Sequence, residues 1–169
     1  MRIELLAQTA DDTRAMGEAL AACLRPRDAV ILTGELGAGK TTLVQGIARG
    51  LEVRDPIVSP TFTLIREYHG RVELAHVDVY RLDRIQDVLD LGLEELGDGE
   101  AVLLVEWGDA IEELLPADHL TVELTTGSGE SDVQARRIVL WPGGRSWVER
   151  WERLEQVLEP WTTAREAGA

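Results

Sequence analysis

The chain contains a single lysine, Lys40, which lies in a segment whose residue types suit the binding of phosphate. Residues 34–41 read Gly-Glu-Leu-Gly-Ala-Gly-Lys-Thr and fit the pattern G-x-x-x-x-G-K-[ST]. At every other position with a long basic side chain, that side chain is arginine. A lysine ammonium is slim enough to fit between a loop and a triphosphate, whereas the arginine guanidinium is a wide planar fork. The segment therefore predicts a phosphate-binding site built around Lys40.

Each part of this loop has an expected role. The backbone N–H groups of residues 37–42 are expected to point at the β-phosphate, helped by the positive end of the helix that follows. Lys40 is expected to bridge the β- and γ-phosphates, and the Thr41 hydroxyl to bind Mg²⁺. The predicted nucleotide-binding residues of the loop are Leu36, Gly37, Ala38, Gly39, Lys40, Thr41 and Thr42.

A magnesium ion bound with a nucleotide usually has a second protein anchor, a carboxylate at the end of a buried strand. Two acids fit this description, because Asp78 follows Leu-Ala-His-Val and Glu106 follows Val-Leu-Leu-Val. Both are expected at the carboxyl edge of the sheet, where such ligands bind. Both are predicted as catalytic and metal-binding residues, and the sequence does not choose between them as the direct ligand. His76 is interpreted as a packed strand histidine without a catalytic role.

The segments on either side of the loop predict the elements that position it. Residues 29–33 form a short apolar run that predicts a buried strand directly before Gly34. Residues 41–51 have helical spacing of their apolar side chains and predict the helix that follows. Residues 9–24 predict another helix, with Thr9 or Asp11 as its N-cap. Strand, glycine-rich loop and helix form the context that this motif requires.

The rest of the chain predicts an α/β fold, a P-loop NTPase-like three-layer sandwich with a mixed central sheet flanked by helices. Trp147 and Trp151 are expected in the core. We expect one domain over residues 1–160 and a loose C-terminal tail over 161–169. The predicted strands are 61–68 and 72–79 (a hairpin), 101–105, and the pair 119–125 and 136–141, and the further helices are 85–96, 111–115 and 146–159.

The composition is that of a soluble globular protein, with 44% hydrophobic and 28% charged residues. The net charge of −14 disfavours direct, tight binding of nucleic acid, because an acidic surface repels phosphates. No apolar run approaches the roughly 20 residues that cross a bilayer, and the N-terminus is too short and acidic for a signal peptide. A cytoplasmic protein is therefore expected. Its lone cysteine, Cys23, has apolar neighbours and is expected to be a buried small hydrophobe.

The expected nucleotide is ATP. Guanine-specific GTPases usually read the base with an Asn-Lys-x-Asp element, and this element cannot occur here because Lys40 is the only lysine. The Asp-x-x-Gly switch element is also missing from the sequence.

Four sequence blocks occur in a fixed order, namely residues 34–42, 59–63, 76–81 and 105–107. Together they resemble the TsaE (YjeE) family, the ATPase subunit of bacterial tRNA N6-threonylcarbamoyladenosine biosynthesis. The resemblance covers residues 9–115 well and the C-terminal third weakly. It implies a small cytoplasmic ATPase with weak turnover that works with TsaD and TsaB on tRNA position 37. In that scheme TsaD performs the transfer, and the ATPase reaches tRNA only through the complex and needs no membrane.

The resemblance also assigns roles to single residues. Glu106 matches the family's Mg²⁺-associated acid and Asp78 its Walker-B-like acid. Thr61 matches a switch-like threonine that senses the γ-phosphate and is predicted as catalytic. Arg81 is expected either to stabilise transition-state charge or to contact a partner, and Trp107 either to border the nucleotide or to pack. The regions that approach the nucleotide are matched by Thr9, Thr13 and Arg136.

Two positions depart from the family pattern, and two other functions fit the same loop. Glu35 stands where the family commonly has Asp, and Gly108 stands where Pro is frequent. A P-loop small-molecule kinase would share the strand, loop and helix, but no Arg-bearing lid stands out in the sequence. A non-hydrolytic, ATP-dependent assembly switch would need nucleotide binding alone.

Overall fold

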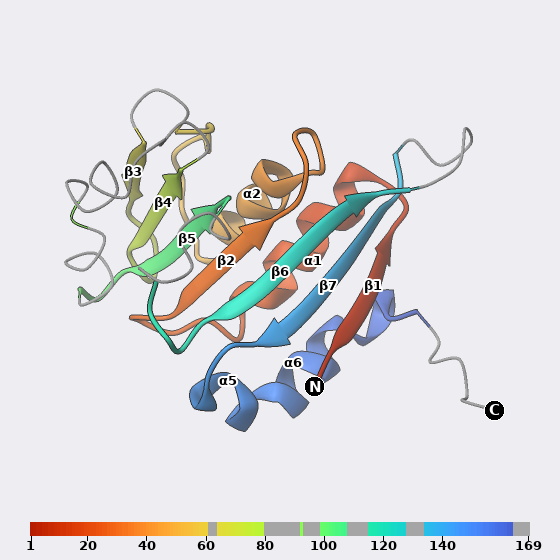
Figure 1. Ribbon diagram of the computed structural model, residues 1–169. Coiled ribbons are helices and arrows are strands. Elements are labelled where there is room, and N and C mark those ends of the chain that lie inside the picture. The colour runs from red at the N-terminus through yellow and green to blue at the C-terminus, as the bar shows by residue number, and fades with distance from the viewer. Residues whose placement is uncertain (61–63, 80–91, 93–98, 108–114, 128–133, 164–169) are drawn as a thin grey trace.

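The computed structural model describes residues 1–60, 64–79, 92, 99–107, 115–127 and 134–163. In this part of the chain, one seven-stranded mixed sheet has the strand order β1-β7-β6-β2-β5-β4-β3 (Figure 1). The strands are β1 (Ile3–Ala7), β2 (Ala29–Thr33), β3 (Ile65–Tyr68), β4 (Leu74–Asp78), β5 (Val102–Glu106), β6 (Leu120–Thr126) and β7 (Arg136–Pro142). The predicted α/β fold with a mixed central sheet is confirmed.

The centre of the sheet is parallel. β2 pairs in parallel with β5 on one side and with β6 on the other, and β4 pairs in parallel with β5. All residues of β4 and β5 are buried, as are the first four of β2, which explains their nearly continuous apolar sequences. Parallel pairing brings the carboxyl ends of these strands together along one side of the sheet, the carboxyl edge, which is uppermost in Figure 1. In the register, Glu106 lies opposite Leu32 on one neighbour and opposite Asp78 on the other.

Antiparallel pairs complete the sheet on both sides. β3 and β4 form the predicted hairpin, and β6 and β7 form the predicted late strand pair. The first strand, β1, was not expected from the sequence. It has only five residues with alternating burial, it lies at the edge, and it pairs with β7.

Two long helices follow the first two strands, α1 (Ala10–Ala21) and α2 (Lys40–Gly50). Thr9 caps α1 as predicted, in a capping box with Asp12. The two helices pack closely through glycines, since a Cβ on Gly46 would lie 2.1 Å from the carbonyl oxygen of Arg14. This contact fixes α2, and with it the loop at its N-terminus, against α1.

The described helices pack on one face of the sheet. Apolar side chains of α1, α2 and the C-terminal helices join one core cluster with Val30, Leu32 and Leu104, and this cluster contains Trp147 and Trp151 as expected. The opposite face carries a smaller cluster that includes Ile31, Val77 and Val105. The predicted helices 85–96 and 111–115, which would cover that face in a three-layer sandwich, lie outside the described residues except for Gly92 and Leu115.

Cys23 lies in the larger core, as expected for a small hydrophobe. Burial raises the pKa of its thiol, which keeps the sulfur protonated and unreactive. In the described part of the chain, no helix has both the length and the apolar character needed to span a membrane.

The C-terminal segment differs from the prediction in two ways. The expected single helix over 146–159 is divided into α5 (Arg145–Glu149) and α6 (Trp151–Leu158), followed by the short 3₁₀ helix η2 (Glu159–Trp161). The break occurs at Arg150, whose Nε donates to the carbonyl of Ser146 at 3.1 Å, the acceptor that a continuous helix would use for its backbone. The expected loose tail is also anchored at its start, because Thr162 bridges to Leu5 and the N–H of Thr163 donates to Glu4.

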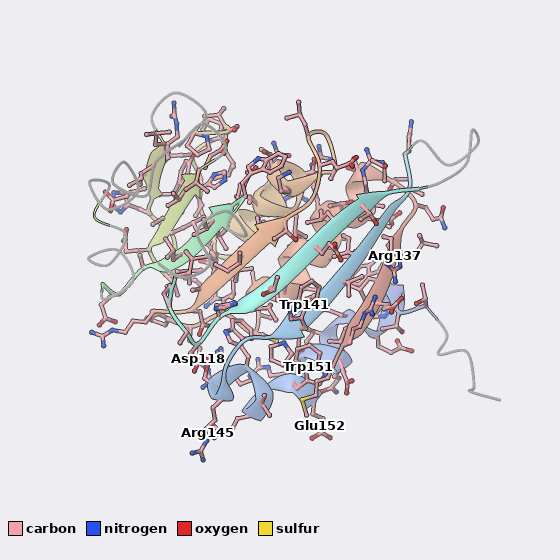
Figure 2. The ribbon with its side chains drawn as sticks, viewed as in Figure 1. Asp118, Arg137, Trp141, Arg145, Trp151 and Glu152 are labelled. Atoms are coloured by element: carbon pink, nitrogen blue, oxygen red, sulfur yellow. The ribbon has the colours of Figure 1, made fainter. Side chains whose placement is uncertain are left out.

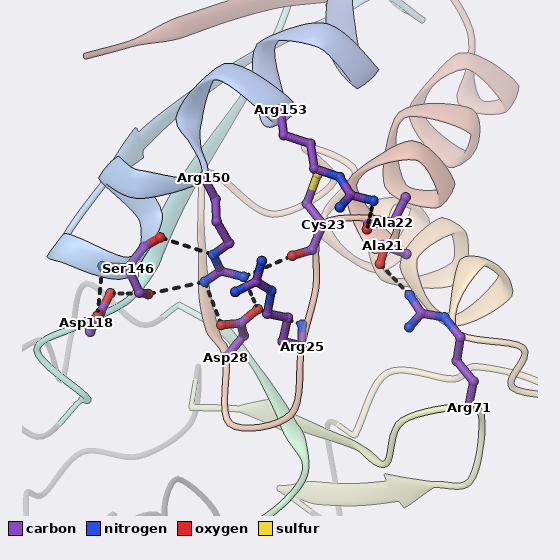
Figure 3. Close-up of polar contacts among 10 residues, drawn as sticks. All are labelled: Ala21, Ala22, Cys23, Arg25, Asp28, Arg71, Asp118, Ser146, Arg150 and Arg153. Atoms are coloured by element: carbon purple, nitrogen blue, oxygen red, sulfur yellow. Dashed lines mark hydrogen bonds and ion pairs between the residues drawn. The ribbon is translucent and has the colours of Figure 1, made fainter.

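A buried ion pair ties α5 and α6 to the turn between α1 and β2 (Figure 3). Two guanidinium nitrogens of Arg150 donate to the two carboxylate oxygens of Asp28, each at 2.7 Å. Arg150 also donates to the carbonyl of Cys23 and lies 4.1 Å from the centre of the Trp147 ring. Bidentate geometry and additional acceptors are the conditions under which a buried ion pair is stable.

Arg150→Met should lower the free energy of unfolding by about 3–5 kcal/mol, because it leaves the buried Asp28 carboxylate without its counter-charge. Urea denaturation measures the change. Arg145→Met is the matched control, since Arg145 is exposed on α5 and pairs with the exposed Glu149 one turn later (Figure 2). The control should change stability by less than about 0.5 kcal/mol. Equal effects of the two substitutions would contradict the role given to the buried pair.

Candidate nucleotide-binding site

The loop between β2 and α2 has the backbone geometry of a phosphate-binding loop. Gly34, Gly37 and Gly39 all have positive φ angles, of 133°, 79° and 103°. Gly39 is the N-cap residue of α2, so the loop leads directly into the positive end of that helix. The side chain of Leu36 in this loop is 78% exposed. This arrangement suits the anion binding predicted from the sequence.

Lys40, the first residue of α2, is buried with its ammonium group inside the loop. Its Nζ donates to the carbonyl oxygens of Gly34 at 2.6 Å and Glu35 at 3.0 Å. The same Nζ lies 3.8 Å from the centre of the Trp107 ring, a cation–π contact. The ammonium is therefore held in place by the backbone of the loop and by the ring of Trp107, the residue after β5.

The hydroxyl of Thr41 reaches the end of β5. Its Oγ1 donates to Oε1 of Glu106 at 3.1 Å, although 65 positions of sequence separate the two residues. A threonine hydroxyl has one proton to donate and two lone pairs. With its proton directed at Glu106, the lone pairs of Thr41 remain suitable for a cation.

Glu106 has a second contact on the same oxygen. Nε2 of His76 lies 2.8 Å from Oε1, and both side chains are buried. His76 lies in the interior of a strand, as predicted, but its contact with Glu106 was not predicted. One signal was available, because alternation along β4 puts His76 on the same face as Asp78, two residues later.

Asp78 ends β4 directly beside Glu106. Its Oδ2 accepts a hydrogen bond from Ser59 at 3.3 Å, which attaches the segment after α2 to the edge of the sheet. The N–H of Asp78 donates to the carbonyl of Leu64, so the chain on both sides of Thr61 is held close to this acid. Thr61 itself, together with Arg81 and Gly108, lies outside the described residues.

Trp107 follows Glu106 in a conformation that L-residues rarely adopt, with a φ of 63°. Its N–H donates to the carbonyl of Leu32 at 2.9 Å, which extends the pairing of β5 with β2. This turn brings the ring to Lys40 and packs it partly against the smaller core cluster. Trp107 therefore packs against the sheet and also contacts the loop through Lys40, while its contact with a nucleotide stays a prediction.

Arg136, at the start of β7, also reaches the loop. Its Nη2 donates to the carbonyl of Gly37 at 3.3 Å, while Nη1 donates to the carbonyl of Ala135. This contact places Arg136 beside the phosphate-binding loop, and its proximity to a bound nucleotide stays a prediction.

The comparisons with known proteins identify the family. A protein-family model described as "Threonylcarbamoyl adenosine biosynthesis protein TsaE" matches residues 7–138. The chain belongs to the TsaE family. The resemblance inferred from the four sequence blocks is therefore confirmed.

Curated relatives and a solved structure agree with this assignment. A tRNA threonylcarbamoyladenosine biosynthesis protein TsaE from Treponema pallidum is 41% identical over 119 residues, 70% of this chain and 88% of the relative. The protein of the same name from Bacillus subtilis is 42% identical over 125 residues, 73% of this chain and 78% of the relative. The crystal structure of YdiB from Bacillus subtilis is similar with a TM-score of 0.79 and 33% identity, over 92% of this chain and 95% of that chain.

The position of Thr9 and Thr13 relative to the loop follows from the sheet topology. Both lie at the start of α1, on the sheet edge that carries the loop, because β1 runs parallel to β2 (Figure 1). Thr9 is engaged in the capping box, and the hydroxyl of Thr13 donates to the carbonyl of Thr9. Their described hydrogen bonds thus stabilise the helix, and their proximity to a nucleotide stays a prediction.

The residues at this edge fit a magnesium ion bound together with a nucleotide. Magnesium in such sites takes a hydroxyl, one or two carboxylates, water and phosphate oxygens. Thr41, Glu106 and Asp78 supply the first two kinds of ligand from adjoining elements. Among the described residues, no group of three or more His, Cys, Asp or Glu side chains is placed to hold a metal ion.

Gly34→Ala should damage the loop far more than Gly37→Ala. A Cβ at Gly34 would lie 2.2 Å from the carbonyl oxygen of Leu124 in β6, whereas a Cβ at Gly37 meets nothing within 4 Å. Backbone strain alone should make Gly37→Ala cost about 1–2 kcal/mol. At Gly34 the overlap adds to the strain, and we expect a loss of more than about 3 kcal/mol. Thermal unfolding of both variants measures the difference, and similar melting temperatures would contradict it.

Proposed function

We propose that this TsaE-family chain binds ATP with Mg²⁺ and hydrolyses it as an accessory protein of tRNA threonylcarbamoyladenosine biosynthesis, together with TsaD and TsaB. The observation that carries the proposal is the contact between Thr41 and Glu106. It joins the hydroxyl of the phosphate-binding loop to the acid at the end of β5, directly beside Lys40. The names of the curated relatives support the pathway.

Each residue of the site has a task in this proposal. The backbone N–H groups of residues 37–42 and the ammonium of Lys40 bind the phosphates, and Thr41 with Glu106 and Asp78 would hold the metal. Bound magnesium supplies positive charge on the phosphate oxygens, which favours the loss of the terminal phosphoryl group. Arg136, already in contact with Gly37, adds a further positive charge to the rim of the loop. Because catalysis of phosphoryl transfer is mainly positioning and charge stabilisation, these groups suffice for slow hydrolysis.

The charge of the chain supports the indirect route to tRNA. With a net charge of −14, the surface repels the phosphate backbone of RNA, so in the proposed scheme the partner proteins bind the tRNA. Leu36 is exposed in the loop itself, and Val58 is exposed directly before Ser59, which contacts Asp78. Exposed apolar side chains around a site are consistent with a protein partner.

Lys40→Ala should lower the rate of ATP hydrolysis at least about 100-fold and weaken nucleotide binding, because it removes a charge aimed at the phosphates. Lys40→Arg should do the same, since the wide guanidinium must fit where an ammonium now lies between two carbonyls and an indole ring. Arg49→Ala, an exposed cation on the same helix, should leave the rate unchanged. Normal hydrolysis by Lys40→Ala would refute the site.

Glu106→Ala distinguishes an ATPase from a non-hydrolytic switch. If it still binds a fluorescent ATP analogue but no longer hydrolyses ATP, tRNA modification reconstituted with TsaD and TsaB should be lost. Restored modification by this hydrolysis-deficient, binding-competent variant would show that binding alone is sufficient and would overturn the ATPase proposal.

The partner proteins should accelerate the reaction. We expect slow hydrolysis by the isolated chain and faster hydrolysis when TsaD and TsaB are added together, measured as phosphate release at saturating ATP. The Lys40→Ala chain mixed with the same partners is the control for contaminating activity. A rate that no partner changes would contradict the proposed accessory role.

A further inference from the structure

His76 is a polar side chain buried in β4, the strand next to the edge strand β3. It is fully inaccessible to solvent and belongs to β4, between Leu74 and Val77. Along β4 it shares its face with Leu74 and Asp78, because alternate residues of a strand point the same way. That face is the one covered by α1 and α2, since Leu74 belongs to the same core cluster as their apolar residues.

The histidine reaches the neighbouring strand diagonally. Its register partner on β5 is Leu104, and Glu106 lies two residues further along the same strand. Such diagonal neighbours are within reach of long and aromatic side chains. Nε2 of His76 thereby comes to 2.8 Å from Oε1 of Glu106, the oxygen that also accepts from Thr41 at 3.1 Å.

The hydrogen bond fixes where the proton of His76 lies. Against an ionised Glu106, a bare Nε2 at this distance would set its lone pair against a carboxylate oxygen, so with this carboxylate Nε2 carries the hydrogen and donates. Nδ1 is buried and makes no hydrogen bond among the described residues. A hydrogen on Nδ1 would therefore be a buried donor without an acceptor, which is costly. Both nitrogens favour the same tautomer, with Nε2–H directed at Glu106.

We propose that His76 is a positioning residue that holds the Glu106 carboxylate beside Thr41, in the orientation needed for binding nucleotide with Mg²⁺. This inference rests on the proposed function, and it adds a residue that the assigned site does not contain. Both donors use Oε1, so the hydrogen bonds fix the rotation of the carboxyl group without engaging Oε2. Glu106 is only 4% exposed, so water is a poor substitute for the lost donor when His76 is removed.

Three substitutions at one position separate a specific hydrogen bond from mere packing. His76→Gln places an amide N–H near the position of Nε2 and should keep the bond to Glu106. His76→Asn has the same functional group on a shorter side chain, which ends near the position of Nδ1 and cannot reach Glu106. His76→Leu fills the space without any donor.

The readout is the affinity for a fluorescent, non-hydrolysable ATP analogue, measured once with Mg²⁺ and once with EDTA. The ratio of the two affinities isolates the metal-dependent part of binding from the phosphate contacts of the loop. We expect a ratio well above one for the unsubstituted chain and a fall of about 10–100-fold for His76→Leu and His76→Asn, the usual effect of removing a group that orients a metal ligand. His76→Gln should keep the ratio within a few-fold, and the affinities in EDTA should change little.

A double substitution with Glu106→Gln tests the route of the effect. If His76 acts through Glu106, His76→Leu should have almost no further effect on the ratio once Glu106 is replaced. Additive losses, or equal losses in His76→Gln and His76→Asn, would overturn the positioning role. If His76→Leu does not fold, the comparison of Gln with Asn decides alone. A ratio of one in the unsubstituted chain would instead refute the Mg²⁺-dependent site of the proposed function and this inference with it.

Discussion

Parallel pairing of β2, β5 and β4 determines where chemistry can occur in this chain. The register puts Leu32, Glu106 and Asp78 side by side, and the loop with Lys40 begins two residues after Leu32. A slip of one residue in β5 would turn Glu106 towards the opposite face and separate it from Thr41. The continuous burial of these strands resists such a slip, so the core that stabilises the sheet also sets the geometry of the site.

The loop and the two elements beside it could be predicted from the sequence because the residues that determine them are close together in the chain. The apolar run of β2, the glycines and the helical spacing of α2 all lie within about 25 residues, and the predicted bounds of β2 agree with the structure. Asp78 and Glu106 were found in the same way, because each follows an apolar run and the edge of a parallel sheet collects such ends.

Features that depend on distant partners were missed. The break between α5 and α6 occurs at Arg150, whose partner Asp28 is 122 positions away, while the apolar spacing of residues 146–159 reads as one helix. The hydrogen bond between His76 and Glu106 depends on the register between β4 and β5. The sequence indicates which side chains of one strand share a face, but not which residues of two strands lie opposite each other. The positive φ at Trp107 was also missed, because the residue at this position is not glycine, the residue type that usually indicates such a conformation. The edge strand β1 is too short for its alternation to distinguish it from a loop.

The anchored start of the C-terminal tail has a consequence for how copies of this chain behave towards one another. β1 is the outer strand of the sheet, and an outer strand with unpaired backbone groups invites strand-by-strand association. Thr162 and Thr163 pair with Leu5 and Glu4 on this edge and occupy part of it. The last described residues thus pair with backbone groups of β1 that a strand of a neighbouring molecule would need for the same pairing.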